Sequence, residues 1–277
     1  MSSFIVIGGD KRMLSTAKRL GAAVCGFEKL SLCNGIYNNG EAFSFAVLPP
    51  QKSPDGINIY CPDSDIMIPY NALKKAIRIG GTIFTGYVCD ELQRVCDDSG
   101  LKLVNYLDRE ELAVKNAVLT AEGALSVIIS QTEHSVYGAK ILVTGYGRIA
   151  KILAEYLTVM GARVTVACRK SGDRAWAETK GCKTVNITNK AEFVTAVSKA
   201  DIIANTVPAT VFGDEEAASM KSNALYIELA SVNGVSSVPE AVKEVTARGL
   251  PGKTAPVTAG EIIADTILNI LSEERGS

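Results

Sequence analysis

The stretch that decides the fold is Lys140-Ile141-Leu142-Val143-Thr144-Gly145-Tyr146-Gly147-Arg148-Ile149-Ala150. An apolar run leads into a glycine loop, residues 151–160 follow with helical spacing, and a second apolar run occupies 163–167. The loop has the spacing G-x-G-x-x-A. The first glycine allows a tight turn, the second lets the backbone approach a pyrophosphate, and the small third residue lets helix and strand pack closely. The helix N-terminus adds N–H groups and a dipole that favour an anion. The stretch therefore predicts a Rossmann-type dinucleotide site.

The end of the second strand predicts which dinucleotide binds. An Asp or Glu about 20 residues after the glycines would bind the ribose 2′-hydroxyl of NAD. The chain has Arg169, Lys170 and Ser171 there, and Asp173 lies too far along. Two cations and a hydroxyl suit a 2′-phosphate, so we expect NADP, with a solvated basic turn as the alternative.

The expected cofactor contacts come from three turns. Asn205-Thr206-Val207-Pro208 ends the fourth strand, where a loop can pass the nicotinamide ribose, or where the strand simply turns. The full expected set is Gly145, Tyr146, Gly147, Arg148, Ile149, Arg169, Lys170, Ser171, Asn205, Thr206, Val207 and Pro208.

Strand-like and helix-like runs alternate along the whole chain, which is typical of βαβ units and parallel sheets. The first series has strands at 4–7, 22–27, 42–48, 82–85 and 101–105, with helices at 11–21 and 69–79. A helix over 110–132 joins it to a second series, with strands at 140–144, 163–167, 184–186, 202–205 and 224–229 and a final helix at 259–271. We expect an α/β protein with two Rossmann-like domains, each a doubly wound parallel sheet, and an interdomain cleft. Residues 1–112 with 258–277 form the catalytic or substrate domain, and 113–257 the NADP-binding domain. The C-terminal helix returns to the first domain.

Composition limits the classes of function. Among 277 residues, 29 basic and 30 acidic side chains nearly balance, so no nucleic-acid or acidic-membrane partner is expected. The first residues lack the pattern of a signal peptide, and no apolar run approaches the roughly 18 residues of a membrane span, so a cytoplasmic protein is expected. Seven cysteines without a CxxC pair, and the single histidine His134, predict reduced thiols and no metal site.

The chain resembles the A subunit of dipicolinate synthase. The resemblance is carried by residues 7–10, 120–124, 145–148, 205–209, 228–231, 249–253 and 255–260, of which the Thr120 segment and the last segments are the most specific. It implies an enzyme of bacterial sporulation that oxidises dihydrodipicolinate to dipicolinate with NADP, together with a flavoprotein-like B subunit. Where the family usually has an aspartate and a proline-glycine-glycine turn, this chain has Glu228 and Val232-Asn233-Gly234. That departure leaves the geometry of the cofactor loop open.

The implied substrate is a planar dicarboxylate, which needs cations or helix N-termini and a group that removes a proton. For substrate binding we expect Gly9, Asp10, Lys11 and Arg12 after the first strand, or simply a glycine turn with solvated charges there. Ser231 and Lys253 join them through their family segments. For catalysis we expect Glu122 as the base, with Asn116 and Thr120 on the same helix. The alternative for Glu122 is an ordinary exposed helix residue.

Two other functions fit the layout. A two-domain hydroxyacid dehydrogenase would need a catalytic histidine with an arginine and an acidic partner, which cannot be assembled convincingly around His134. A nucleotide-sensing regulator would need an attached channel or DNA-binding element, and the sequence shows neither. Homo-oligomer formation is left open.

Overall fold

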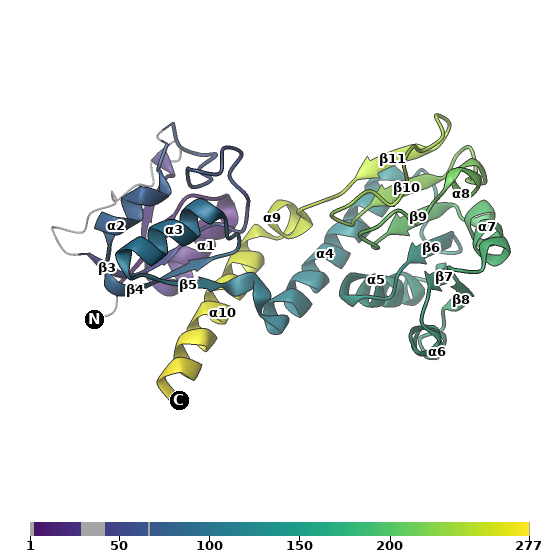
Figure 1. Ribbon diagram of the computed structural model, residues 1–277. Helices are drawn as coiled ribbons and strands as arrows, with labels where there is room; N and C mark the ends of the chain where they lie inside the picture. Colours follow the sequence, from purple (N-terminus) through teal and green to yellow (C-terminus); the bar gives the residue numbers. More distant parts are fainter. Residues whose placement is uncertain (1–2, 29–41, 66, 277) are drawn as a thin grey trace. The chain divides into compact units, whose positions relative to one another are not determined.

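The computed structural model describes residues 3–28, 42–65 and 67–276 (Figure 1). Its internal contacts divide the chain into two compact units, Met1–Asn116 with Ala255–Ser277, and Ala117–Thr254. The expected boundaries at 112/113 and 257/258 lie close to these divisions. Each unit is described by itself below.

The first unit is built on a five-stranded parallel sheet. Its order is β2 (Ala23–Cys25), β1 (Phe4–Ile7), β3 (Phe43–Val47), β4 (Ile77–Thr85) and β5 (Lys102–Asn105). One face packs against η2 (Tyr70–Ala72), α2 (Leu73–Ala76) and α3 (Asp90–Ser99). The other face packs against α1 (Lys11–Leu20) and α10 (Pro256–Gly276). Because both faces are covered, this unit is the doubly wound domain that the sequence predicts.

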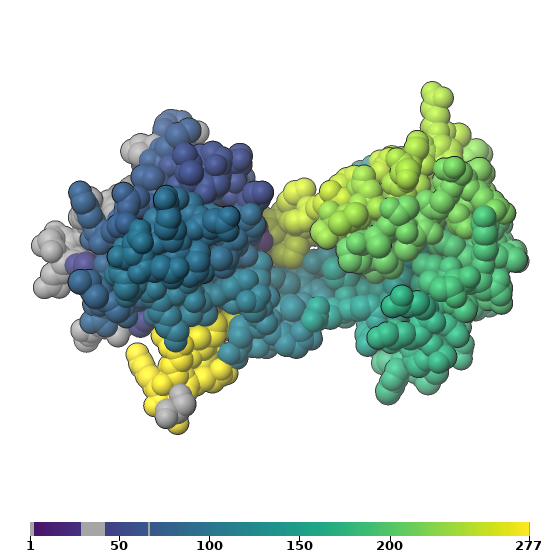
Figure 2. All heavy atoms as spheres, viewed as in Figure 1, coloured from purple at the N-terminus to yellow at the C-terminus, as the bar shows by residue number. Residues whose placement is uncertain are grey.

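Helix α10 returns to the first unit, as expected, and a glycine makes this possible. A Cβ on Gly260 would lie 2.1 Å from the carbonyl oxygen of Arg12, so only a glycine allows α1 and α10 to approach so closely. Thr16 Oγ1 donates to the Gly260 carbonyl at 2.9 Å and fixes the crossing. Residues 272–276 are exposed and extend past the surface of the first unit (Figure 2).

The prediction of a helix over residues 69–79 is wrong at its C-terminal end. Helix α2 ends at Ala76, and Ile77 begins β4 by pairing with Phe43. The apolar spacing around Lys74 and Lys75 is helical, but pairing with β3 determines the conformation from Ile77 onward. Helix α3 and η3 (Tyr106–Asp108) were not expected.

The second unit contains a six-stranded parallel sheet. Its order is β11 (Lys243–Thr246), β10 (Leu225–Glu228), β9 (Ile202–Asn205), β6 (Lys140–Thr144), β7 (Arg163–Cys168) and β8 (Lys183–Asn186). Helices α4 (Glu110–Gln131), α5 (Arg148–Val159) and α6 (Ser171–Thr179) cover one face, and α7 (Lys190–Lys199) and α8 (Asp214–Ala218) cover the other. The direction in which the chain winds reverses between β6 and β9, and ligands of such sheets bind outside the strand ends at that point. The five expected strands are confirmed, whereas β11 is new.

Helix α4 is the one described helix that is long and apolar enough to cross a membrane by length and composition. Ala121, Ala124 and Ile128 on this helix are fully buried in the core of the second unit, which is the pattern of a core helix. Gly123 lets α9 (Leu250–Thr254) lie against it, because a Cβ there would be 2.8 Å from Leu250 Cβ. The two most specific segments of the sequence resemblance therefore meet at this contact.

Candidate dinucleotide site

The glycine loop between β6 and α5 has the geometry of an anion site. Gly145 has a φ of 84°, in the left-handed region that favours glycine, and Gly147 forms the N-cap of α5 without a side-chain hydrogen bond. A Cβ on Gly147 would meet no atom within 4 Å. The space above this residue is open and the helix N-terminus has no side-chain cap, so the loop fits a pyrophosphate.

Other residues of the loop pack against the core of the second unit. Tyr146 is 9% exposed and packs in the core, where burial raises the pKa of its hydroxyl. Lys151 Nζ lies 5.5 Å from the centre of its ring. Ala150 is fully buried, as expected for the small third position, and Ile149 packs beside it. Tyr146 and Ile149 can therefore contact a cofactor through their backbone, whereas Arg148 is exposed.

The turn after β7 carries exposed cations and no carboxylate at its tip. Arg169 and Lys170 are exposed and form no ion pair with another described residue. Ser171 begins α6, whose N-terminus has no side-chain cap. Arg174, which sequence reasoning missed, donates to the carbonyls of Arg169 at 2.8 Å and Cys168 at 3.3 Å and so holds the turn. The turn thus places Arg169 and Lys170 directly before the N-terminus of α6.

Cys168, at the end of β7, lies in surroundings that disfavour its thiolate form. Burial raises the pKa of its thiol, and the nearby Asp173 carboxylate raises it further, although Arg174 lowers it. The six cysteines among the described residues are all free thiols. Cys33 lies outside the described residues.

The turn after β9 packs directly on the glycine loop. A Cβ on Gly145 would lie 2.9 Å from Thr206 Oγ1 and 3.0 Å from Val207 Cγ2. Thr206 Oγ1 donates to the Thr144 carbonyl at 2.7 Å. Asn205 is fully buried, and Pro208 is exposed at the tip. Two of the predicted cofactor residues, Thr206 and Val207, thus lie beside Gly145 at the carboxyl edge of the sheet.

Glu228, at the end of β10, is a buried carboxylate that sequence reasoning noted only as a departure from the family. It accepts hydrogen bonds from the Asn205 amide, the Tyr226 hydroxyl and the backbone N–H groups of Ala230 and Gly234. Thr144, Asn205 and Glu228 are register partners on neighbouring strands. A sequence signal for these three residues exists, because each is the polar last residue of an otherwise apolar strand.

The residues proposed for the substrate lie in two places. In the first unit, the Arg12 guanidinium donates to both carboxylate oxygens of Asp10, at 3.0 and 2.8 Å, and Lys11 is exposed. Gln51, which was not predicted, donates to Asp10 Oδ2 at 2.5 Å and keeps a buried Oε1 without a hydrogen bond. In the second unit, Ser231 and Lys253 are both exposed.

The expected catalytic residues lie along α4. Glu122 is exposed beside Gly123, while Asn116 and Thr120 are half-buried. Asn116 belongs to the first unit and the other two to the second, so the division of the chain falls within this helix. Their catalytic role stays a prediction.

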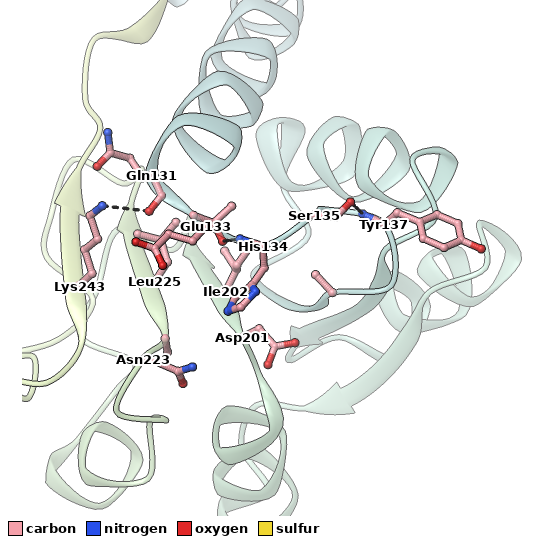
Figure 3. A pocket seen from close by; sticks show the side chains of 13 residues that line it. Gln131, Glu133, His134, Ser135, Tyr137, Asp201, Ile202, Asn223, Leu225 and Lys243 are labelled. Atoms are coloured by element: carbon pink, nitrogen blue, oxygen red, sulfur yellow. Dashed lines mark hydrogen bonds between the residues drawn. The ribbon is translucent and has the colours of Figure 1, made fainter.

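His134 lies in a pocket at the opposite edge of the second sheet. The pocket, of about 640 Å³, is lined by the segment after α4 and by the first residues of β9, β10 and β11. Figure 3 shows His134 beside Asp201 and Ile202, and Lys243 Nζ donating to the Gln131 carbonyl, at 2.9 Å. Parallel strands place their two ends at opposite edges, so the only histidine of the chain is far from the glycine loop.

Comparisons with known proteins agree with this geometry. Residues 116–243 match the family described as D-isomer specific 2-hydroxyacid dehydrogenase, NAD binding domain. The A subunit of dipicolinate synthase from Bacillus subtilis (strain 168) is 26% identical over 286 residues, covering 97% of this chain and 95% of that protein.

Solved structures show the same fold over the whole chain. The A chain of dipicolinate synthase from Bacillus subtilis has a TM-score of 0.84 at 25% identity, covering 100% of this chain and 98% of that chain. A transhydrogenase from Sinorhizobium meliloti has a TM-score of 0.68 at 15% identity, covering 98% and 94%, which shows the fold alone.

The second unit thus contains a nicotinamide-dinucleotide-binding domain of the dehydrogenase type. The resemblance to the dipicolinate synthase A subunit is confirmed in sequence and in fold, and the relative's name marks that protein as one subunit of an assembly. The chain is therefore similar to the A subunit of dipicolinate synthase over nearly the whole length of both proteins, and its second unit matches an oxidoreductase domain.

Proposed function

We propose that this chain is the NADP-binding subunit of an enzyme that oxidises dihydrodipicolinate to dipicolinate during sporulation. The observation that carries the proposal is the end-to-end likeness to the A subunit of dipicolinate synthase, which includes both units and the helix that returns to the first. A shared dinucleotide domain alone would leave the substrate unspecified. We expect the protein to work in the cytoplasm.

The choice of NADP rests on the turn after β7. Arg169 and Lys170 lie exposed at the N-terminus of α6, where an Asp or Glu would bind the 2′-hydroxyl of NAD. A phosphate there gains charge-assisted hydrogen bonds from arginine and the N–H groups of the helix. Both contributions favour the phosphorylated cofactor.

The chain's own residues have distinct roles in the proposed reaction. A nicotinamide cofactor, once held by the second unit, would supply the acceptor for a hydride from a ring carbon of the substrate. A base removes a ring proton, and we assign this role to Glu122, with Asn116 and Thr120 on the same helix to orient the ring. As carboxylate-binding residues we propose Lys11 and Arg12 in the first unit and Ser231 and Lys253 in the second. Gln51 Oε1, in the first unit, offers an acceptor for a substrate donor. A flavoprotein-like B subunit completes the assembly.

A second function is favoured by the match to the hydroxyacid dehydrogenase domain. Such an enzyme needs a histidine near the nicotinamide to take the hydroxyl proton. His134 lies at the amino edge of the sheet, with Asp201 and the first residues of β10. The chain offers no other histidine, which argues against this reaction.

The test combines the purified chain, its partner subunit, NADP and freshly generated dihydrodipicolinate, and follows NADPH and dipicolinate together. We expect equal amounts of both products, lost when either subunit is omitted. NADPH formation from simple hydroxyacids but not from this substrate would favour the second function. Tight nucleotide binding without turnover of any substrate would favour a nucleotide-sensing protein.

A further inference from the structure

A row of buried polar side chains crosses the sheet of the second unit beneath the glycine loop. Thr144, Asn205 and Glu228 stand opposite one another on β6, β9 and β10, and each is at most 1% exposed. Thr144 Oγ1 donates to Asn205 Oδ1 at 2.5 Å, and Asn205 Nδ2 donates to Glu228 Oε1 at 2.8 Å. The row connects β6, the strand that enters the glycine loop, with β9 and β10 on the other side of the switch point.

Every hydrogen-bond partner of Glu228 is a donor. Besides Asn205, Oε1 accepts from the Ala230 N–H at 2.9 Å, and Oε2 accepts from the Tyr226 hydroxyl at 2.8 Å and the Gly234 N–H at 2.7 Å. No described lysine or arginine forms an ion pair with it. A carboxylate satisfies all four donors at once, whereas an amide of the same shape would turn its NH₂ group toward at least one of them.

The Tyr226 donor lies on β10 itself, and the other three donors belong to two turns at the carboxyl edge. One is the turn after β9, where Asn205 Oδ1 also accepts from the Val207 N–H at 3.1 Å and its amide lies 3.2 Å from the Val207 carbonyl. The other is the turn at residues 230–234. A Cβ on Gly234 would lie 2.2 Å from Asn205 Nδ2, so the second turn rests directly on the first.

The arrangement suggests a role beyond stability. Val207 packs on Gly145, and so Glu228 acts through Asn205 on the edge of the glycine loop. The adenosine end of the cofactor would bind elsewhere, at the turn after β7. A defect in the row should therefore affect the two halves of the dinucleotide differently.

We propose that Glu228 is a positioning residue that holds the turns at 205–208 and 230–234 in place for the nicotinamide half of the cofactor. The proposal rests on the proposed cofactor function of the second unit. Glu228 itself does not touch the cofactor in this role. Glu228 organises the donors and small residues around that half before the cofactor binds.

The experiment compares Glu228→Gln with Glu216→Gln in the full-length chain. Glu216 is a matched control because it is also buried and its carboxylate accepts one backbone N–H, that of Gly213, and not one from the turns at 205–208 or 230–234. Calorimetric titrations measure the affinity of each variant for NADP and for 2′,5′-ADP, which lacks the nicotinamide half. We expect Glu228→Gln to weaken NADP at least about tenfold, since buried donors lose their acceptor, and 2′,5′-ADP by no more than about twofold. Glu216→Gln should change neither affinity.

Amide hydrogen exchange of the cofactor-free chain gives a second readout. In Glu228→Gln the amides of Val207, Ala230 and Gly234 should exchange faster, while that of Ile203 within β9 stays protected. If Glu228→Gln does not fold, Tyr226→Phe takes its place, because it removes one donor from the same carboxylate. It should weaken NADP binding more than 2′,5′-ADP binding, by a smaller factor than Glu228→Gln.

Three results would overturn the proposal. Wild-type affinity of Glu228→Gln for NADP would show that the row does not position the site. An equal loss of NADP and 2′,5′-ADP binding would show a general structural defect. Failure of the wild-type chain to bind either ligand would refute the proposed cofactor function, and the role of Glu228 with it, so the two failures are distinguishable.

Discussion

The two units place a glycine turn at the same point, after the first strand of each parallel sheet and before its first helix. In the first unit the turn is Gly8-Gly9-Asp10, and in the second it is Gly145-Tyr146-Gly147. The first turn is filled by the protein itself. A Cβ on Gly9 would lie 2.4 Å from Met13 Cγ and 2.9 Å from Pro49 Cβ, whereas the space above Gly147 is empty.

The helix that follows each turn also begins differently. Asp10 caps α1 by accepting the Arg12 N–H at 3.0 Å, so a carboxylate of the chain already occupies the position that an external anion would take. No side chain caps α5. The same topology thus gives a closed turn in one unit and an anion site in the other, and the difference depends on a few residues around the glycines.

The largest expected effect comes from filling the open turn. Gly147→Val would place a branched side chain where the pyrophosphate must approach, and we expect at least about a hundredfold loss of NADP affinity. The backbone φ of −79° is accessible to valine and nothing lies within 4 Å of its Cβ, so the free energy of unfolding should change by no more than about 0.5 kcal/mol. Titration and chemical denaturation measure the two effects. Unchanged affinity would show that the loop does not bind the cofactor.

The same substitution in the closed turn should give the reverse result. Gly9 has a φ of 93°, and a side chain there would overlap Met13 and Pro49. We expect Gly9→Val to lower the free energy of unfolding by about 3 kcal/mol or more. Denaturant titration checks this, and a variant as stable as the wild type would contradict the assignment of a filled turn.

The third effect concerns the cations after β7. Arg169→Asp removes an attraction for the 2′-phosphate and adds a repulsion, so NADP should weaken at least about tenfold while NAD changes little. Lys183→Asp is a control for the change in net charge, because Lys183 is exposed at the amino end of the neighbouring strand β8. A constant ratio of NADP to NAD affinity in Arg169→Asp would refute the choice of cofactor.

The smallest effect lies at the amino edge of the second sheet. Partial burial raises the pKa of the Asp201 carboxyl, but hydrogen bonds from Lys221 and from the Lys140 N–H lower it more, so the pKa lies below its ordinary value of 3.8. The resulting stability is present above that ordinary value and is lost as the pH falls through the lower pKa of the folded state. Asp201→Asn should lower the free energy of unfolding by about 0.5 kcal/mol near pH 7, a figure reduced for the exposure of this side chain. The variant should also lose less stability than the wild type as the pH falls below the ordinary pKa of the carboxyl. NADP affinity should not change, because the site is at the other edge.

Much of the second unit was predictable from its sequence because local signals agree there. The apolar run at 140–144 is followed by glycines, a helix and a second strand, and the structure places strand, turn and helix in that order. The helix end near Ile77 could not be located, since its pairing partner Phe43 is distant in the chain. Strand β11 has only one half-buried residue among its four, so hydrophobic periodicity gives it no signal.

The sequence predicts the glycines and cations of the candidate site, and these stay predictions, but it does not predict the contacts that support them. Gly147 and Arg169 were identified because backbone approach and phosphate charge require those residue types at that spacing. The roles of Glu228, Arg174 and Gln51 depend on partners brought together from separate strands and turns. Spacing along the chain contains no information on such contacts.

The most direct test of the dinucleotide site is a calorimetric titration of the wild-type chain with NADP and with NAD under identical conditions. We expect a single site per chain that binds NADP at least about tenfold more tightly than NAD, since a 2′-phosphate gains charge-assisted hydrogen bonds at Arg169 and Lys170. A preference for NAD, or the absence of binding to both, would contradict the claim that the open turn of the second unit is an NADP site.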